Sequence, residues 1–149
     1  KKFIDEKEKI YRGYAAEKGF KLMPGTKELL KFLKNKKIKC AIASSASRRN
    51  ISLAVKKTGI KKYFSAIVAA EDVKRHKPYP DPLLKAAKLL HVKPAECIYI
   101  GDSIFEMIAA RRARMFALGI HTGIYSANQL KKNGAKAVIR KISQLKNFL

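Results

Sequence analysis

Short apolar runs alternate with helical patterns along this chain, and this alternation constrains the fold more than any other feature. Each run is short, apolar and bounded by polar or turn-forming residues, as expected of a strand buried on both faces. Strands that alternate with helices form a parallel sheet with helices on both sides, so the sequence predicts an α/β fold in three layers, α/β/α. The predicted strands are residues 38–43, 66–69, 97–101, 115–119 and 137–139.

The segments between the strands carry helix-end signals. Thr26 and Asp81 are residue types that cap the amino end of a helix, and we expect helices to start there. Gly59 and Gly134 are placed to end helices. A last helix is predicted over residues 142–149.

A helix predicted over residues 3–18 is expected to be separate from the rest. The boundary is expected within residues 19–23, where the chain changes from a helical pattern to a break. Residues 1–19 would then form a separate helical element, and residues 20–149 one α/β domain.

The composition is that of a globular chain. Hydrophobic residues make up 47% and charged residues 30%, and no apolar run is long enough to cross a membrane. The amino end shows no signal-peptide pattern. Cys40 and Cys97 both lie in predicted strands, so we expect buried thiols and a cytoplasmic location.

The net charge of +23 has two interpretations. Such a charge attracts polyanions, nucleic acid among them. The lysines are spread along the chain rather than held in one tail, which also fits a solvated lysine-rich surface without a partner.

Two carboxylates follow the predicted strand 97–101. Asp102 comes directly after it, and Glu106 lies one helical turn later, so both can point at one position. Ligands of open α/β sheets bind at the carboxyl ends of strands, and paired carboxylates there suit Mg²⁺ together with a phosphate. A structural alternative stays open, in which Asp102 caps the helix and Glu106 is a solvated acid.

Phosphate-binding groups follow two other predicted strands. Ser44 and Ser45 follow strand 38–43 at a helix start, where hydroxyl and backbone N–H donors suit phosphate. Lys77 lies in the loop after strand 66–69, and an ammonium group also suits phosphate. Each alone has a simple structural explanation. Together with the carboxylates they indicate one site for a phosphate and its metal ion.

This ordered set resembles the haloacid dehalogenase-like superfamily, in particular its phosphoglycolate phosphatase and β-phosphoglucomutase branch. The matching stretches are Ala41–Ser45, Lys77–Pro82 and Gly101–Glu106. The resemblance implies a Rossmann-like parallel sheet and a Mg²⁺-dependent phosphatase that acts on a small phosphorylated metabolite through an aspartyl-phosphate. It also implies that residues 1–19 are the last helix of a helical cap domain and that residues 20–149 are the core.

The resemblance also implies roles for the site residues. Ser44, with Ser45 beside it, would hydrogen-bond the transferring phosphoryl group. Lys77 would stabilise its charge, and Asp102 with Glu106 would hold Mg²⁺. These roles are positioning and electrostatics, which phosphoryl transfer chiefly requires.

One family motif is not found in these 149 residues, namely Asp-x-Asp-x-Thr after the first strand. The four aspartates are Asp5, Asp72, Asp81 and Asp102, and none begins an Asp-x-Asp. The nucleophile and its strand, which the family places between the strands before Ser44 and before Asp102, are therefore expected to be missing. We expect the chain to be inactive as it stands.

Three outcomes are open for that gap. The chain begins with Lys1 rather than Met, which favours a longer parent protein that carries the strand. In the second outcome, a separate segment or a second chain supplies it. In the third, the two flanking strands pair directly and the site is inactive.

Two functions stay open beside the phosphatase. The chain could be a catalytically silent basic domain that binds nucleic acid through its positive surface. It could also be an interaction protein that completes another chain by strand exchange.

Overall fold

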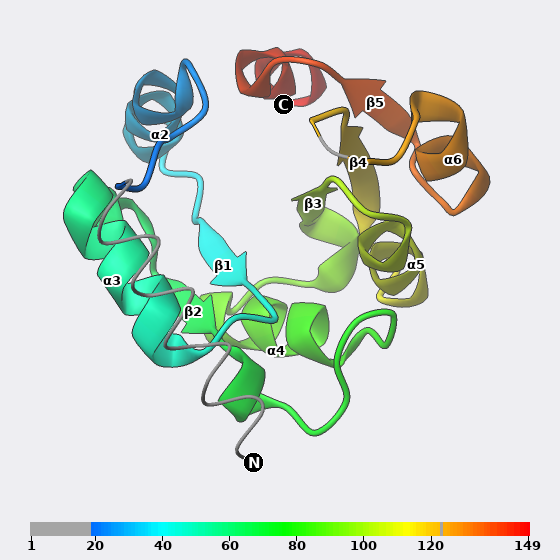
Figure 1. Cartoon of the computed structure of the whole chain (residues 1–149), viewed down its shortest axis with the longest axis horizontal. Helices are drawn as coiled ribbons and strands as arrows, with labels where there is room; N and C mark the ends of the chain where they lie inside the picture. Colours follow the sequence, from blue (N-terminus) through cyan, green and yellow to red (C-terminus); the bar gives the residue numbers. More distant parts are fainter. Residues whose placement is uncertain (1–18, 123) are drawn as a thin grey trace.

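The computed structural model describes residues 19–122 and 124–149, so the predicted helix over residues 3–18 and the domain assignment of residues 1–19 lie outside the described residues, Gly19 excepted. Within these ranges, five short strands form two parallel sheets (Figure 1). The first sheet pairs β1 (Ala41–Ala43) with β2 (Ala66–Val68). The second has the order β3 (Ile98–Gly101), β4 (Phe116–Ile120) and β5 (Ala137–Ile139).

Helices follow the strands in the alternation that the sequence predicted. The α-helices are α2 (Thr26–Asn35), α3 (Arg48–Thr58), α4 (Asp81–Leu90), α5 (Ile104–Arg112) and α6 (Ala127–Lys132). Short 3₁₀ helices are η1 (Lys61–Tyr63), η2 (Ala70–Asp72), η3 (Pro94–Glu96) and η4 (Ile142–Phe148). No helix of the described residues combines the length and the apolar character that crossing a membrane requires.

The sheets lie between two helical layers, which confirms the predicted three-layer fold. Helices α4, α5 and α6 supply one layer, with Leu83, Met107 and Leu130 fully buried in its core. The opposite layer holds α2, α3 and η4. There, Leu33 of α2 packs in one apolar cluster with Leu118 of β4.

The sheet is interrupted between β1 and β3, which face each other in Figure 1 with no described strand between them. Cys40 O accepts a hydrogen bond from Ser65 N, so the backbone groups of Cys40 point toward β2. Successive residues of a strand point these groups to opposite sides, so those of Ala41 point away from β2. Cys97 O likewise accepts from Phe116 N, so Ile98 points its backbone groups away from β4. Among the described residues, two unpaired strand edges therefore face the interruption, and the direct pairing considered above does not occur.

The two thiols are more exposed than predicted. Cys40 and Cys97 are free, as predicted, but both are half-buried rather than buried. Burial still raises the pKa of both thiols.

Several helix ends differ from the sequence prediction. Gly25 is the N-cap of α2, while the Thr26 hydroxyl donates to Met23 O instead. Asp81 is the first residue of α4 and its carboxylate binds Arg75, because Pro80 takes the N-cap position. The predicted terminal helix is a 3₁₀ helix, η4. The predicted end of α3 at Gly59 is confirmed, with φ at 71°.

Candidate functional site

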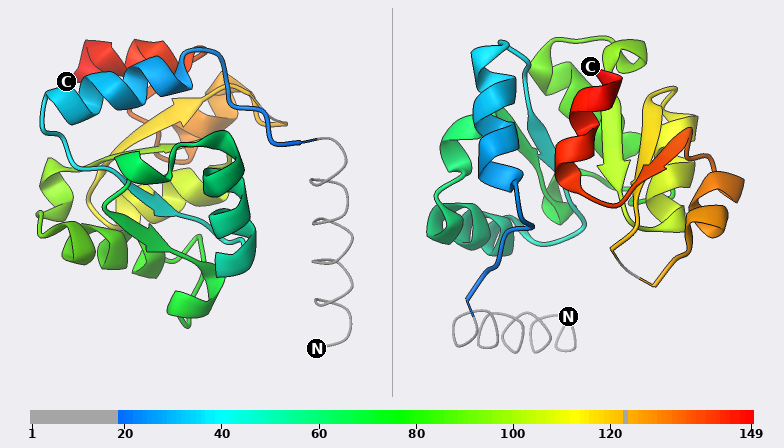
Figure 2. Two further views of the ribbon diagram at one scale, coloured as in Figure 1. Left: turned by 90° about the vertical axis from the view of Figure 1, so that its left-hand side faces the viewer. Right: turned by 90° about the horizontal axis from the view of Figure 1, so that it is seen from above.

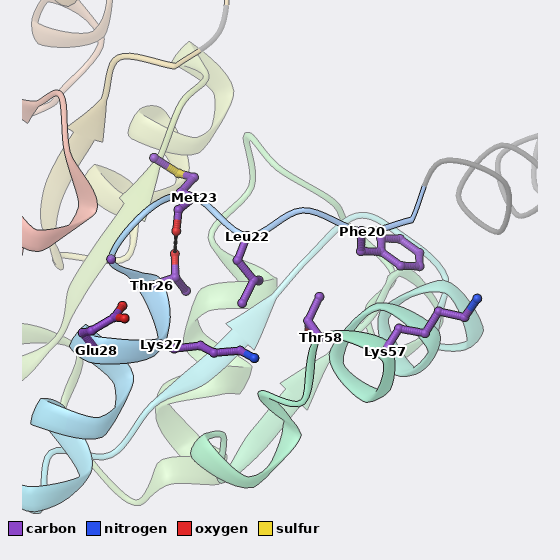
Figure 3. Close-up of a pocket in the computed structure, with 9 residues that line it drawn as sticks. Phe20, Leu22, Met23, Thr26, Lys27, Glu28, Lys57 and Thr58 are labelled. Atoms are coloured by element: carbon purple, nitrogen blue, oxygen red, sulfur yellow. Dashed lines mark hydrogen bonds between the residues drawn. The ribbon is translucent and has the colours of Figure 1, made fainter.

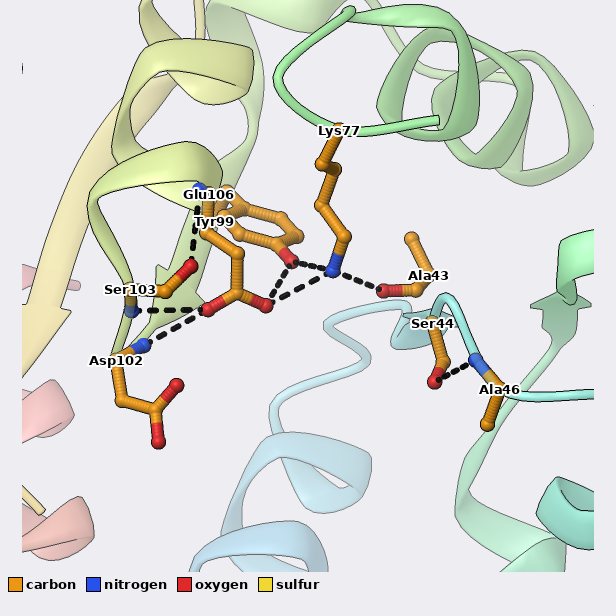
Figure 4. Close-up of polar contacts among 8 residues, drawn as sticks. All are labelled: Ala43, Ser44, Ala46, Lys77, Tyr99, Asp102, Ser103 and Glu106. Carbon is orange, nitrogen blue, oxygen red and sulfur yellow. Dashed lines mark hydrogen bonds and ion pairs between the residues drawn. The ribbon is translucent and has the colours of Figure 1, made fainter. Parts of the chain in front are cut away.

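The carboxyl ends of β1 and β3 bring the predicted residues to one cavity of about 390 Å³ (Figure 4). All five predicted site residues line it, although they come from three separate parts of the chain. The lining residues are Ser44, Ser45, Ala46, Lys77, Asp102, Ser103, Phe105 and Glu106.

Lys77 lies at the centre of the polar contacts in this cavity, and only 9% of its side chain is exposed. Its Nζ donates to Glu106 Oε1 at 2.9 Å, to the Tyr99 hydroxyl at 3.1 Å and to Ala43 O at 3.4 Å. These three acceptors use all three donors of the ammonium group. Because Ala43 belongs to β1 and Tyr99 to β3, Lys77 bridges the two sheets.

Glu106 is bound through both carboxylate oxygens. Oε1 accepts from Lys77 and from the Tyr99 hydroxyl, the latter at 3.0 Å. Oε2 accepts the backbone N–H groups of Asp102 at 2.9 Å and Ser103 at 3.2 Å. The Ser103 hydroxyl in turn accepts from Glu106 N, which completes a capping box at the start of α5.

These contacts determine the protonation of the buried groups. Burial by itself raises the pKa of the Glu106 carboxyl, but the charge of Lys77 and the hydrogen bonds to the carboxylate hold that pKa below its ordinary value. Burial, and then the nearby charge of Glu106, raises the pKa of the Tyr99 phenol. At neutral pH the Glu106 carboxylate is therefore charged and the Tyr99 phenol is neutral.

Gly101 makes the close approach of Glu106 possible. A Cβ atom at this position would lie 2.6 Å from Glu106 Oε2 and 2.8 Å from Glu106 Cβ, which no side chain tolerates without a shift. The glycine between the strand and Asp102 therefore has a packing reason that the sequence pattern alone does not reveal.

Asp102 presents the one carboxylate among the lining residues that is not engaged by an ammonium group or a backbone N–H. Its side chain is exposed, and its one side-chain contact is a long one, 3.5 Å from Oδ2 to the Thr122 hydroxyl. Among the described residues, no group of three or more His, Cys, Asp or Glu side chains could hold a metal ion. Mg²⁺ often takes one or two protein carboxylates and completes its shell with water and phosphate, so Asp102 fits such an ion in part.

Ser44 lies at the cavity, but the helix behind it begins later than the sequence suggested. The Ser44 hydroxyl accepts from Ala46 N at 3.1 Å, and Ser47 is the N-cap of α3. The first N–H of the helix, at Arg48, donates to the carboxylate of Glu71. The expectation of free helix-start N–H groups next to Ser44 is therefore wrong for Ala46 and Arg48.

Four residues of the site were not predicted, namely Ala46, Tyr99, Ser103 and Phe105, and Tyr99 and Phe105 have the largest side chains among them. Tyr99 joins Lys77 to Glu106, and Phe105 lines the cavity with 47% of its surface exposed. A tyrosine in a buried strand two residues before Gly101 is a polar tip that requires a partner, and this was the available signal.

A second cavity, of about 400 Å³, lies between the start of α2 and the end of α3 (Figure 3). It contains none of the predicted site residues. Its lining is Phe20, Leu22, Met23, Gly25, Thr26, Lys27, Glu28, Lys57 and Thr58.

Comparison with known proteins adds to this geometry. Residues 1–120 match the family described as haloacid dehalogenase-like hydrolase. The chain is 36% identical over 127 residues to the chloroplastic 5-amino-6-(5-phospho-D-ribitylamino)uracil phosphatase of Arabidopsis thaliana, covering 85% of this chain and 33% of that protein. It is 27% identical over 135 residues to phosphoglycolate phosphatase of Escherichia coli, covering 91% and 54%.

A solved structure agrees with the fold. The β-phosphoglucomutase of Clostridium difficile superposes with a TM-score of 0.74 at 32% identity, over 83% of this chain and 52% of that one. The chain thus spans about half the length or less of these three proteins.

Proposed function

Because the chain belongs to the haloacid dehalogenase-like hydrolase family, we propose that it supplies the phosphate- and metal-binding core of a Mg²⁺-dependent phosphatase for a small phosphorylated metabolite. The observation that carries the proposal is the meeting of a hydroxyl, an ammonium group and a free carboxylate at one cavity, from Ser44, Lys77 and Asp102. Two relatives, both named as phosphatases, support the reaction class.

Ser44, Lys77 and Phe105 would contribute to phosphate-ester binding in different ways. The Ser44 hydroxyl accepts from Ala46 N and keeps its own O–H to donate to a phosphate oxygen, with Ser45 beside it at the cavity wall. Lys77, fixed by three acceptors, supplies a positive charge that needs no reorganisation during transfer. The exposed phenyl ring of Phe105 limits the space next to these groups.

Asp102 would hold Mg²⁺ at the cavity. When bound, the ion neutralises phosphate charge. Metal binding by Glu106 stays a prediction. Both oxygens of its carboxylate already accept hydrogen bonds, and in this arrangement Glu106 would orient Lys77.

The nucleophile must come from outside the described residues. The open edges of β1 and β3 accept one parallel strand, and its carboxyl end would reach the cavity between Ser44 and Asp102. A strand that carries Asp-x-Asp there would place a carboxylate next to Lys77. We therefore propose that another segment or a second chain supplies it.

The test is hydrolysis of p-nitrophenyl phosphate by the chain mixed with a synthetic strand peptide of the Asp-x-Asp-x-Thr type. We expect Mg²⁺-dependent turnover that neither component shows alone, lost by roughly a hundredfold or more in Lys77→Met and in Asp102→Asn. A peptide with asparagine at the first aspartate is the matched control and should bind without turnover. Turnover indifferent to Mg²⁺ or to both substitutions, or none when the peptide binds, contradicts the proposal.

A further inference from the structure

Two long stretches of this chain contain many basic residues and no acidic residue. No Asp or Glu lies between Glu28 and Glu71, where eleven Lys and Arg residues occur, and none follows Glu106, where nine occur. The acids of the described residues therefore concentrate in the segment that builds the cavity. A field of one sign should dominate wherever the acid-free stretches meet.

The fold places lysines of these stretches over two aromatic rings, and the two stretches meet at one of the rings, Phe32. The Nζ atoms of Lys34 and Lys62 lie 5.9 and 5.4 Å from the centre of the Tyr63 ring. Those of Lys36 and Lys146 lie 5.9 and 4.6 Å from the centre of the Phe32 ring. These four exposed lysines, from α2, η1 and η4, form two pairs, one at each ring, and together we call them the basic patch. Figure 2 shows α2 and η4 side by side.

All four lysines lie at the carboxyl end of a helix, where a cation is favoured: Lys34 and Lys36 at α2, Lys62 at η1 and Lys146 at η4. These positions favour each cation locally but leave its charge exposed to solvent. The three ion pairs found within residues 19–122 and 124–149 involve Arg48, Arg75 and Lys77, so none of them neutralises the patch.

The basic patch lies at the opposite edge of the sheets from the cavity. Helix α2 leads into β1 and η1 leads into β2, so the patch lies near the amino ends of these strands. Ser44 and Asp102 follow the carboxyl ends of β1 and β3. A ligand on the patch would therefore not be the ligand of the cavity.

We propose that the basic patch binds single-stranded nucleic acid through its phosphate backbone. Ammonium groups from three elements can follow the repeated charge of a flexible strand, and each phosphate contact releases bound counterions. The half-exposed rings of Phe32 and Tyr63 offer apolar surface for a base next to those charges. This binding is independent of the proposed phosphatase function.

The test is the fluorescence anisotropy of a short labelled oligothymidylate titrated with the chain at several salt concentrations. We expect the Kd to rise at least about tenfold in the triple variant Lys34→Gln, Lys62→Gln, Lys146→Gln, with a shallower salt dependence. The matched control is Lys131→Gln, Lys132→Gln, Lys136→Gln on the side of α6, which removes the same charge and should change the Kd less than about twofold.

A third variant separates charge from folding. Arginine at Lys34, Lys62 and Lys146 should retain binding, and circular dichroism melting shows whether each variant is folded. Equal weakening by the two glutamine variants would assign the binding to net charge alone and overturn the patch. No binding at low salt, or tighter binding to phosphatidylserine vesicles than to the oligonucleotide, also overturns it.

Discussion

The Nζ atom of Lys77 lies 2.9 Å from Oε1 of Glu106, and this ion pair connects the two halves of an interrupted sheet. Lys77 follows β2 and also contacts Ala43 O at the end of β1, while Glu106 is fixed to the first turn of α5 after β3. The pair is largely buried, so each charge depends on the other for its solvation.

Glu106→Gln should therefore destabilise the chain by about 2 to 3 kcal/mol, because it leaves the Lys77 ammonium group buried beside a neutral partner. Urea unfolding followed by circular dichroism measures the change. The control is Asp81→Asn, which removes the partner of the exposed Arg75 and should have a much smaller effect. Equal effects of the two substitutions would mean that the buried pair has no special weight.

Tyr99→Phe should lower the free energy of unfolding by about 1 to 2 kcal/mol while the fold is kept. The substitution removes the hydroxyl that accepts from Lys77 and donates to Glu106, and it leaves the ring in place. The double variant Tyr99→Phe, Glu106→Gln should lose less free energy of unfolding than the sum of the two single variants, because both groups belong to one hydrogen-bond network. Strict additivity would argue against that network.

The stability contributed by Glu106 should depend on pH in a defined direction. Its pKa is lowered in the folded chain, so the unfolded chain binds the proton more tightly and stability rises with pH. The contribution is complete above the ordinary carboxyl value of 4.5 and is lost as the pH falls through the lower folded value. The difference in unfolding free energy between the native chain and Glu106→Gln should therefore shrink as the pH falls below 4.5. A constant difference down to the acid transition would refute the assignment.

Gly101→Ala should destabilise the chain by about 2 kcal/mol, because the new methyl group would meet the Glu106 side chain at under 3 Å. Gly119→Ala is a useful comparison, since its Cβ would meet the Leu130 and Val138 side chains at 3.2 Å, where smaller adjustments suffice. Thermal melts of the two variants should differ, with Gly101→Ala the less stable.

The sequence predicted the strands and the convergence of the site because both follow from simple patterns. Short apolar runs identify β1 to β5, and polar residues after such runs necessarily gather at one sheet edge. The start of α3 was harder to predict, since Ser44, Ser45 and Ser47 all suit an N-cap. The choice of Ser47 depends on a turn closed by the Ser44 hydroxyl and on Glu71 from a distant segment.

The hydrogen bonds around Lys77 could not be predicted from the sequence, because they also join segments that are far apart along the chain. Tyr99 is one of several large residues in a strand, and its hydroxyl gains its two partners only because the loop after β2 brings Lys77 next to Glu106 of α5. The break between β1 and β3 was expected from a family resemblance. Whether the edges would close on each other depended on packing that no local pattern records.

Mg²⁺ binding should depend on Asp102 and much less on Glu106. Asp102 carries an exposed carboxylate without an ammonium or N–H partner, whereas the Glu106 oxygens already accept four hydrogen bonds from Lys77, Tyr99, Asp102 N and Ser103 N. Titration calorimetry with MgCl₂ in the presence of inorganic phosphate should show a Kd roughly tenfold or more higher in Asp102→Asn. Asp81→Asn, outside the cavity, should leave the Kd unchanged. A larger loss in Glu106→Gln than in Asp102→Asn, in protein shown to be folded, would instead make Glu106 the principal ligand and would require its hydrogen bonds to open.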